Sequence, residues 1–383
     1  MRARSRRNGQ TLVAVGDVVL NRPRLDEPFR RVRDLFRAAD FTLINLESPI
    51  SEGGSSVIHQ IVTHRQRPES VEVLRDAGVD AVSFANSHCM DYGPVALLDT
   101  LRHLKKGGIG CAGAGPNANE AAKPIFLERD GTSLAFLSYC TILKAGFAAG
   151  PGSPGMAGLR VATYYEIHQS ERYGAGQPGR ALVTVTILDK DDVRQVQRDV
   201  RNAKRRADVV VVAFHWGISF NYDMVSYQRE LAHATIDAGA DLIIGHHPHC
   251  LKGLEVYQGR VIAYSLGNFI YDMPNVTAED RHHRAGLLKH VLTHGLRWDP
   301  SDPYHPFPDM SRDSVILQGR IAGGRIRDVS LLPAYIGRGG IPAVHDGARG
   351  AGRRILSLLD RLSHPMATQV VIRDGRGIPG PLG

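Results

Sequence analysis

The amino-acid sequence predicts an α/β fold whose sheet has substantial parallel character. One arrangement recurs along the chain: a stretch with helical spacing, a turn that ends in Asp, a run of apolar residues, and then polar groups. Apolar and β-branched runs of this kind suit strands that are buried on both faces. Strands that alternate with helices predict parallel neighbours, because a crossover helix usually joins parallel strands.

Seven apolar runs mark the predicted strands in order. They are residues 11–15, 41–44, 81–85, 133–139, 209–214, 242–245 and 261–266. Four of them follow a turn that ends in Asp, namely Asp40, Asp80, Asp208 and Asp241. The polar groups after the runs are then predicted to meet, since the carboxyl ends of parallel strands lie along one edge of a sheet.

Helices are predicted between the strands at 95–106, 193–206 and 225–238. Pro94 opens the first helix, and Gly107 ends it. Asp192 is the predicted N-cap of the second, which carries basic residues toward its C-terminus. Gly239 stops the third. A shorter helical stretch, 354–362, lies in a tail rich in Gly and Arg.

The chain is predicted to hold one main domain, residues 11–340. Residues 1–10 carry four arginines and form a basic, disordered N-terminus. Two loop insertions are predicted, at about 144–180, rich in Gly and Pro, and at about 272–313, rich in His, Pro and Asp. Long loops of this kind are functional lids or disordered segments. Residues 341–383 are a C-terminal extension.

Composition places the 383-residue chain among globular proteins, with 43% hydrophobic and 22% charged residues. No apolar run approaches the ~20 residues that span a bilayer, and no signal-peptide core follows the N-terminus. We therefore expect a cytoplasmic protein without a membrane anchor. The net charge of +8 suits a small-molecule or polyanionic substrate. No nucleic-acid partner is expected, because no Lys/Arg stripe with interleaved aromatic residues is present.

Side chains that can bind metals follow one predicted strand after another. They are Asp17, Asn45, Glu47, Asn86, His88, Asp91, His215, His246, His247, His249 and Asn268. A lone Asp or His at such a position is usually a turn, a cap or a solvated polar group. The recurrence at successive strand ends predicts a metal site instead. Its oxygen and imidazole ligands suit Mn, Fe, Zn or a mixed pair of ions.

The segment 245–249, Gly-His-His-Pro-His, is the densest part of this set. In an extended segment the side chains of His247 and His249 point the same way, and Pro248 stiffens the arrangement. Both are predicted to hold metal, while His246 faces the other side as a supporting or phosphate-contacting group. The alternative is a polar loop without a ligand.

Other motifs in the sequence give weaker indications of function. Residues 108–113 fit G-x-G-x-x-G, but they follow a helix and precede Pro116, so we interpret them as a turn rather than a dinucleotide site. The sequence contains no Walker A, H-E-x-x-H or G-x-S-x-G motif. The histidine-rich run 282–294 is interpreted as a solvated lid, with an accessory metal site as the alternative.

Several stretches resemble the CapA family, which is named for poly-γ-glutamate capsule synthesis. They are GDVVL (16–20), NLESPI (45–50), ANSHCMDYG (85–93), GCAGAGPNANEA (110–121), HWG (215–217), DAGADLIIGHHPHCLKGLEVYQG (237–259) and YSLGNFIYD (264–272). The family is related to calcineurin-like metallophosphoesterases. The resemblance, over roughly 11–272, implies a four-layer α/β/β/α sandwich with a dinuclear metal site at the carboxyl ends of its strands.

The same resemblance implies roles for the residues. The implied metal ligands are Asp17, Glu47 as the bridge, Asn86, His215, His247 and His249, around two divalent ions drawn from Mn, Fe, Zn or Mg. His88 is the implied general acid or phosphate contact, oriented by Asp91. The implied substrate contacts are Asn45, His246 and Asn268.

The function that follows is a metal-dependent hydrolase acting on a phosphoester or a γ-glutamyl amide through metal-activated water. One alternative is a non-catalytic accessory protein of polymer synthesis with a ligase partner. Another is a metal-dependent ligase or transferase in a secondary pathway. Two departures keep these alternatives open: Val19 stands where metallophosphoesterases usually carry His, and Ser87 separates Asn86 from His88.

Overall fold

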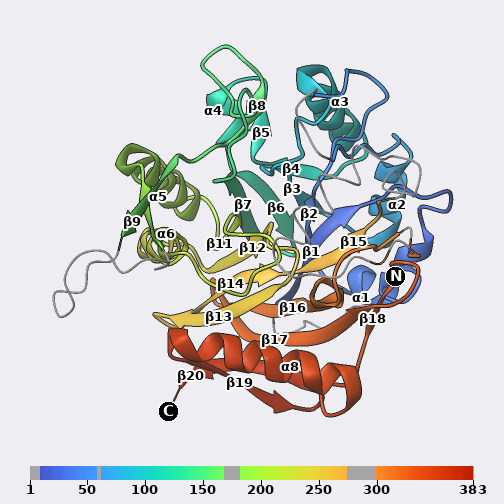
Figure 1. Cartoon of the computed structure of the whole chain (residues 1–383), viewed down its shortest axis with the longest axis vertical. Helices are drawn as coiled ribbons and strands as arrows, with labels where there is room; N and C mark the ends of the chain where they lie inside the picture. Colours follow the sequence, from blue (N-terminus) through green and yellow to red (C-terminus); the bar gives the residue numbers. More distant parts are fainter. Residues whose placement is uncertain are drawn as a thin grey trace.

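Two β-sheets packed face to face occupy the middle of the molecule (Figure 1). The computed structural model describes residues 9–57, 62–167, 182–273, 299, 301–302 and 304–382. The first sheet has the strand order β19-β20-β17-β16-β1-β2-β3-β4, and the second has the order β13-β14-β12-β11-β7-β6. The first sheet is parallel at one end and the second at its centre, and both parallel parts agree with the alternating sequence pattern.

The first sheet is parallel on one side of β1 and antiparallel on the other. The parallel strands are β1 (Gln10–Val19), β2 (Phe41–Leu46), β3 (Ala81–Ser83), β4 (Gly110–Ala112) and β15 (Asn268–Tyr271), which pairs with β1. The antiparallel strands are β16 (Asp313–Ala322), β17 (Arg325–Ile336), β18 (Pro342–Val344), β19 (Thr368–Arg373) and β20 (Arg376–Pro381).

The second sheet has four parallel strands between two antiparallel edges. The parallel strands are β7 (Thr132–Cys140), β11 (Val209–His215), β12 (Leu242–His246) and β14 (Arg260–Leu266). The edges are β6 (Ile125–Arg129) and β13 (Leu251–Tyr257). Two small ribbons lie outside the sheets: β5 (Ala114–Gly115) with β8 (Gly155–Met156), and β9 (Val161–Ile167) with β10 (Leu182–Leu188).

Helices cover the outer face of each sheet (Figure 1). On the first sheet lie α1 (Arg33–Ala38), α2 (Ser70–Ala77) and α3 (Gly93–Lys106); on the second lie α5 (Lys190–Lys204) and α6 (Ser226–Asp237). Shorter helices are η1 (Glu27–Phe29), α4 (Ala118–Ala121), η3 (Asp309–Arg312) and η4 (His364–Met366). Among the described helices, none combines the length and the apolar composition that crossing a membrane requires.

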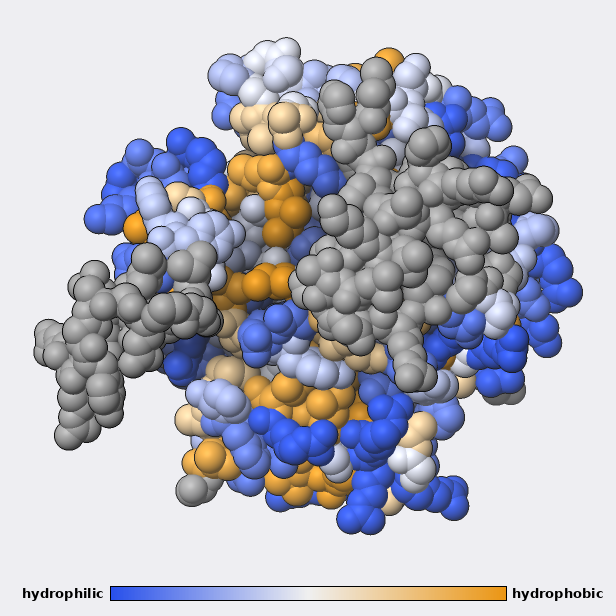
Figure 2. Space-filling model, in the orientation of Figure 1, coloured by the Kyte–Doolittle hydropathy of each residue, from blue (hydrophilic) through white to orange (hydrophobic). Residues whose placement is uncertain are grey.

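Three apolar clusters hold these layers together. Phe41 and Phe136 belong to the cluster between the sheets. Phe36 joins the cluster under α1 to α3, and Val200 the one under α5 and α6. The four-layer α/β/β/α fold implied by the sequence is thus confirmed. In Figure 2, hydrophilic residues lie around the rim of the visible face, and apolar residues gather toward its middle.

The C-terminal residues 341–383 are joined to the first sheet. Leu331 of β17 pairs with Gly377 of β20. The helix α8 (Gly350–Ser363) packs against β13, β17 and β19 and places Leu359 in the cluster between the sheets. The domain boundary at 340 stays a prediction, but shared strands and a shared core connect its two sides.

Several element predictions needed correction. The first strand does not end before Gly16, because β1 continues to Val19 after a register shift, and Asp17 N–H donates to Gly267 O over 3.1 Å. The N-cap of α5 is Asp189, which accepts from the N–H of Asp192, rather than Asp192 itself.

Some loop predictions are tested only in part. The predicted insertion at 144–180 contains β8 and β9 in its described part, so it is not loop throughout. Most of the insertion at 272–313, the run 282–294 and residues 1–8 lie outside the described residues.

Gly245 tests how closely the strands approach one another at this edge. A Cβ added there would meet Tyr264 O at 2.0 Å and Trp216 Nε1 at 2.6 Å. We expect Gly245→Ala to destabilise the fold by about 3 kcal/mol, as overpacking does. Gly152→Ala is the control, because nothing lies within 4 Å of its added Cβ. Urea unfolding checks both, and equal stabilities of the two variants would contradict the close approach.

Leu359→Ala tests whether α8 is part of the cooperative core. The side chain is fully buried, so its removal is expected to cost about 2–5 kcal/mol. If α8 and the sheets unfold together, fluorescence and far-UV circular dichroism will still give one shared midpoint. Val371→Ala, at a side chain that is 39% exposed, serves as the control. Separate midpoints for the two probes would show that the C-terminal part unfolds on its own.

Candidate metal centre

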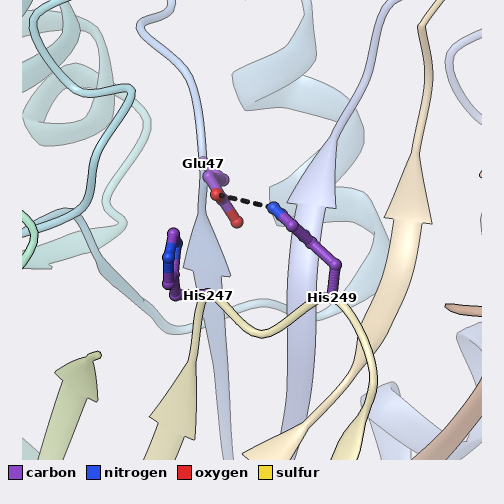
Figure 3. A group of neighbouring side chains, drawn as sticks. All are labelled: Glu47, His247 and His249. Atoms are coloured by element: carbon purple, nitrogen blue, oxygen red, sulfur yellow. Dashed lines mark ion pairs between the residues drawn. The ribbon is translucent and has the colours of Figure 1, made fainter. Parts of the chain in front are cut away.

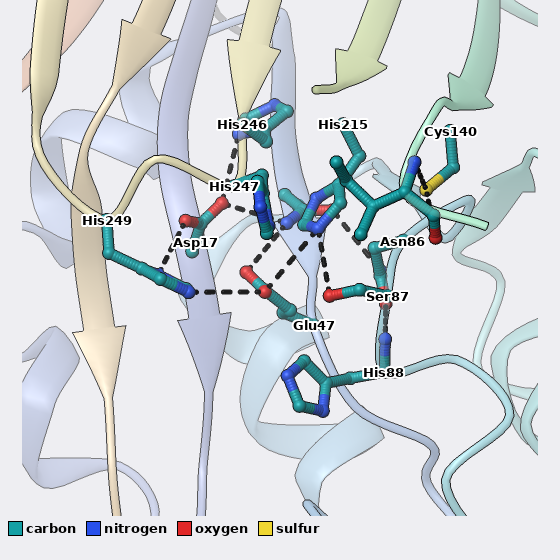
Figure 4. A network of polar contacts seen from close by, with 12 residues as sticks. Asp17, Glu47, Asn86, Ser87, His88, Cys140, His215, His246, His247 and His249 are labelled. Carbon is teal, nitrogen blue, oxygen red and sulfur yellow. Dashed lines mark hydrogen bonds and ion pairs between the residues drawn. The ribbon is translucent and has the colours of Figure 1, made fainter. Parts of the chain in front are cut away.

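Five buried side chains meet where strands of both sheets end, and Figure 4 shows four of them, Asp17, Glu47, His215 and His246. Asp17 comes from β1, Glu47 follows β2, and Asn268 begins β15. His215 and His246 are the last residues of β11 and β12. The parallel pairing of Asp17 with Asn268, and of His215 with His246, brings these groups level with one another. These side chains therefore lie at the carboxyl ends of the parallel strands, the edge that the sequence predicts.

Glu47, His247 and His249 form a group that could hold a metal ion (Figure 3). One ligand atom of each lies within 4.8 Å of the others. The Nε2 atom of His249 is 3.8 Å from Oε1 of Glu47. Two ligands at ~2.1 Å from one ion stand roughly 3–4 Å apart, so small side-chain movements suffice for coordination.

Asp17 and Glu47 place two carboxylates side by side in the interior. The amide Nδ2 of Asn45 donates to Asp17 Oδ1 over 2.8 Å and to Glu47 Oε2 over 3.2 Å. Asp17 Oδ2 and Glu47 Oε1 are buried and accept no hydrogen bond from the described residues. Buried charge of one sign is costly without a counter-charge. Divalent cations therefore fit these two oxygen atoms.

The imidazoles of the centre are held by neutral hydrogen-bond partners. His215 Nε2 lies 3.2 Å from Ser87 Oγ and 3.7 Å from Glu47 Oε1. The Nε2 atom of His247 lies 3.1 Å from Ser219 Oγ. The second nitrogen, Nδ1, of each of these rings has no hydrogen-bond partner among the described residues. Each ring thus keeps one nitrogen for a ligand bond.

His249 and His246 flank Asp17. Nδ1 of His249 is 2.9 Å from Asn268 Oδ1 and 3.4 Å from Asp17 Oδ2. Nδ1 of His246 is 3.2 Å from Asp17 Oδ1. His246 therefore lies against a carboxylate of the centre, on the side away from Glu47 in Figure 4. Its predicted contact with substrate stays a prediction.

The backbone of the His247–His249 loop differs from the predicted extended segment. His247 has φ 94° and His249 has φ 53°, both in the left-handed region that favours glycine. The interpretation by alternation was therefore wrong, although both rings do reach the centre. Such residues cost of order 1–3 kcal/mol each and gather at functional sites. Phe220 and Phe307, with ring centroids 5.4 and 5.6 Å from that of His249, hold the loop in place.

Asn86 supports the centre through its hydrogen bonds. Its Nδ2 donates to Leu46 O over 2.7 Å and to Asn45 Oδ1 over 3.3 Å. Its Oδ1 accepts from the N–H of His88 over 3.1 Å. The amide oxygen thus faces the His88 backbone, so the predicted role of Asn86 as a ligand stays a prediction.

His88 and Asp91 form a pair beside the carboxylates. The Nδ1 atom of His88 lies 2.7 Å from Asp91 Oδ2. The N–H of His64 also donates to this oxygen over 2.7 Å, and the His64 ring contacts both His88 and Tyr271. Sequence reasoning missed His64 and Ser219, which are single residues without a motif. Tyr271 was missed although it lies in a stretch that carries the family resemblance.

Burial and neighbouring charges set the protonation of the centre. Burial, and then the nearby Asp17, raise the pKa of Glu47 well above its usual value. Burial acts in the same direction on Asp17, but His246 and His249 hold its pKa well below the usual range. Burial lowers the pKa of His215 and His247. Their imidazoles are therefore neutral, which is the form that binds metals.

Comparison with known proteins decides the family. The sequence model of the family described as bacterial capsule synthesis protein PGA_cap matches residues 11–273. The chain belongs to this family. The matched segment runs from β1 through β15, so it holds all the side chains that meet in the metal centre.

Two relatives and one solved structure show how similar this member of the family is to known proteins. The PGA biosynthesis protein CapA of Bacillus subtilis (strain 168) is 34% identical over 67% of this chain and 62% of its own length. A probable polyglutamine synthesis accessory protein of Mycobacterium tuberculosis is 27% identical over 62% of this chain and 57% of its own. This chain thus spans about three fifths of these relatives. The TT1561 protein of Thermus thermophilus aligns with a TM-score of 0.34, at 10% identity over 68% of this chain and 90% of that one.

Metal binding is expected to depend on the carboxylates and imidazoles of the centre. We expect elemental analysis of the purified family member to give near two divalent ions per chain, with at least one lost in Glu47→Gln and in His249→Gln. Metal that binds only the folded state stabilises it by about 2.7 kcal/mol at 100 times Kd, so thermal unfolding will shift upward with added metal. His364→Gln, a surface change at a side chain 47% exposed, should leave both results unchanged. A variant that keeps its full metal content would remove that residue from the ligand set.

Proposed function

We propose that this protein is a metal-dependent hydrolase acting on a phosphoester or a γ-glutamyl amide. The observation that carries the proposal is the buried pair Asp17 and Glu47. Each has an oxygen atom that accepts no hydrogen bond from the described residues and lies near imidazoles of the centre. Divalent ions bound there would lower the pKa of a coordinated water toward neutrality and polarise the substrate. Mn, Fe, Zn and Mg are all compatible with such a set of oxygen and nitrogen ligands.

The chain's own residues supply the remaining requirements. Asn45 fixes the two carboxylates relative to one another through its amide hydrogens. Asp91 accepts from Nδ1 of His88 and so leaves Nε2 of that ring for the substrate. When Nε2 takes up a second proton, the carboxylate of Asp91 stabilises the imidazolium, and His88 can give that proton to the leaving group or a hydrogen bond to a developing negative charge.

An anionic substrate fits the charge near the centre. Burial lowers the pKa of Lys144, while Asp91 and Glu47 oppose that shift, so the ammonium group acts on the same site as these carboxylates. After burial, the charge of Lys144 contributes most to the lowered pKa of His88. A phosphate ester or a glutamyl carboxylate would offset this positive charge. The names of the relatives, PGA biosynthesis protein and polyglutamine synthesis accessory protein, support the glutamyl class.

A second candidate is a non-catalytic accessory protein that binds a polyanion and works with a ligase. The description of the Mycobacterium tuberculosis relative as an accessory protein favours it. Val19 and Ser87, which replace features usual in metallophosphoesterases, also support it. A stable complex with a polymer-forming ligase, without turnover by the isolated chain, would distinguish this role from hydrolysis.

The hydrolase proposal is tested with metal-loaded protein on aryl phosphates and γ-glutamyl anilides. We expect turnover of one class, and a loss of about 10³-fold or more in kcat for Asp17→Asn and His249→Gln, because each removes charge stabilisation at the reacting centre. Circular dichroism checks that both variants are folded, and His364→Gln is the matched control. Unchanged kcat in the two variants would refute the mechanism. No turnover of either class would favour the accessory role.

A further inference from the structure

His64 contacts both members of the His88–Asp91 pair. Its backbone N–H donates to Asp91 Oδ2, the same oxygen that lies 2.7 Å from His88 Nδ1. Its ring packs edge-on against the His88 ring, with centroids 4.5 Å apart and an interplanar angle of 61°. One residue thus fixes the carboxylate through its backbone and the imidazole through its side chain.

Tyr271 connects this group to the metal centre. Its hydroxyl lies 3.3 Å from His64 Nε2, and the two rings meet edge to face at 5.2 Å. On its other side, the Tyr271 ring packs edge to face on His249 at 5.0 Å. Burial raises the pKa of the phenol well above its usual value, and Glu47 adds to the shift through its charge and a hydrogen bond. The hydroxyl therefore keeps its proton, and it lies within hydrogen-bond distance of His64.

The burial of His64 determines the protonation of its ring. Burial lowers the pKa of His64 well below its usual value, so its ring is neutral and carries one proton. The neutral ring and the Tyr271 hydroxyl share one hydrogen bond, between Nε2 of His64 and the phenol oxygen. The chain of contacts runs from His88 through His64 and Tyr271 to His249.

We propose that His64 and Tyr271 are positioning residues that hold the His88–Asp91 pair in a fixed place relative to His249 of the metal centre. The inference rests on the proposed function, since it gives these two residues the task of aiming the general acid at a leaving group that the metal centre presents. Displacement of a catalytic group by about 1 Å can cost on the order of 10²-fold in rate, which makes such support worthwhile.

The first experiment reads the His88 ring directly and needs no substrate. In protein labelled with ¹⁵N-histidine, the His88 signals are assigned by their loss in His88→Gln. We expect the wild type to show a single tautomer with the proton on Nδ1, and Tyr271→Phe and His64→Phe to show mixed tautomers. Both changes keep a ring, and His64→Phe keeps the N–H that donates to Asp91. His305→Phe is the control, because that ring is also buried and contacts Phe307 at 5.3 Å.

The second experiment uses the leaving group. A poor alkyl leaving group needs a proton from His88, whereas an activated aryl leaving group does not. We expect Tyr271→Phe and His64→Phe to lower kcat about tenfold for the alkyl substrate and less than twofold for the aryl substrate. In the His88→Gln background, neither change should lower kcat further.

The outcomes separate the two proposals. An unchanged His88 tautomer in both variants, or equal losses for both leaving groups, would overturn the positioning role while leaving hydrolysis intact. If the wild type turns over no substrate, the proposed hydrolase fails, and the ¹⁵N spectra still decide whether His64 and Tyr271 hold the His88 ring.

Discussion

The burial of two carboxylates side by side is the constraint on which this structure depends. Asp17 and Glu47 are inaccessible to water, and the amide of Asn45 supplies hydrogen bonds but no charge. In a medium of low dielectric, such a pair needs positive charge nearby or a proton on one carboxyl. Without cations, the raised pKa of Glu47 keeps that carboxyl protonated, while His246 and His249 stabilise the charge of Asp17. Bound cations would take over both roles. The surrounding loops then serve to bring nitrogen ligands to the same place.

The fold meets this constraint by ending strands of two sheets at one edge. β1 and β2 contribute the carboxylates, and β11 and β12 contribute histidines from the opposite sheet. Close strand approach makes this convergence possible, and Gly16 and Gly245 stand where a Cβ would collide with a backbone oxygen. The same glycines thus allow neighbouring strands within each sheet to approach closely and place the ligands at the shared edge.

Much of this arrangement could be predicted from sequence, because buried parallel strands appear in the sequence as apolar runs followed by polar residues. The α/β class, the layers and the edge that collects Asp17, Glu47 and His215 followed from that pattern and from the family resemblance. The left-handed backbone of His247 and His249 could not be predicted, since alternation assumes an extended chain. His64 and Tyr271 were also beyond reach, because their importance lies in contacts between distant segments. The hydrogen bonds of Asn86 depend on a side-chain orientation that residue type does not specify.

The position of β1 has a consequence for how the chain is made. This strand, near the N-terminus, pairs with β15 and with β16, where Leu12 lies opposite Gly319. At roughly 5–20 residues per second, the ribosome needs about 15–60 s to make the residues between these partners. Throughout that time the part of β1 that pairs with β16 lacks its neighbour, and for most of it Asp17 lacks His249. The metal centre can assemble only after His249 has been made, and until β15 and β16 follow, the unpaired edge of β1 needs protection from aggregation.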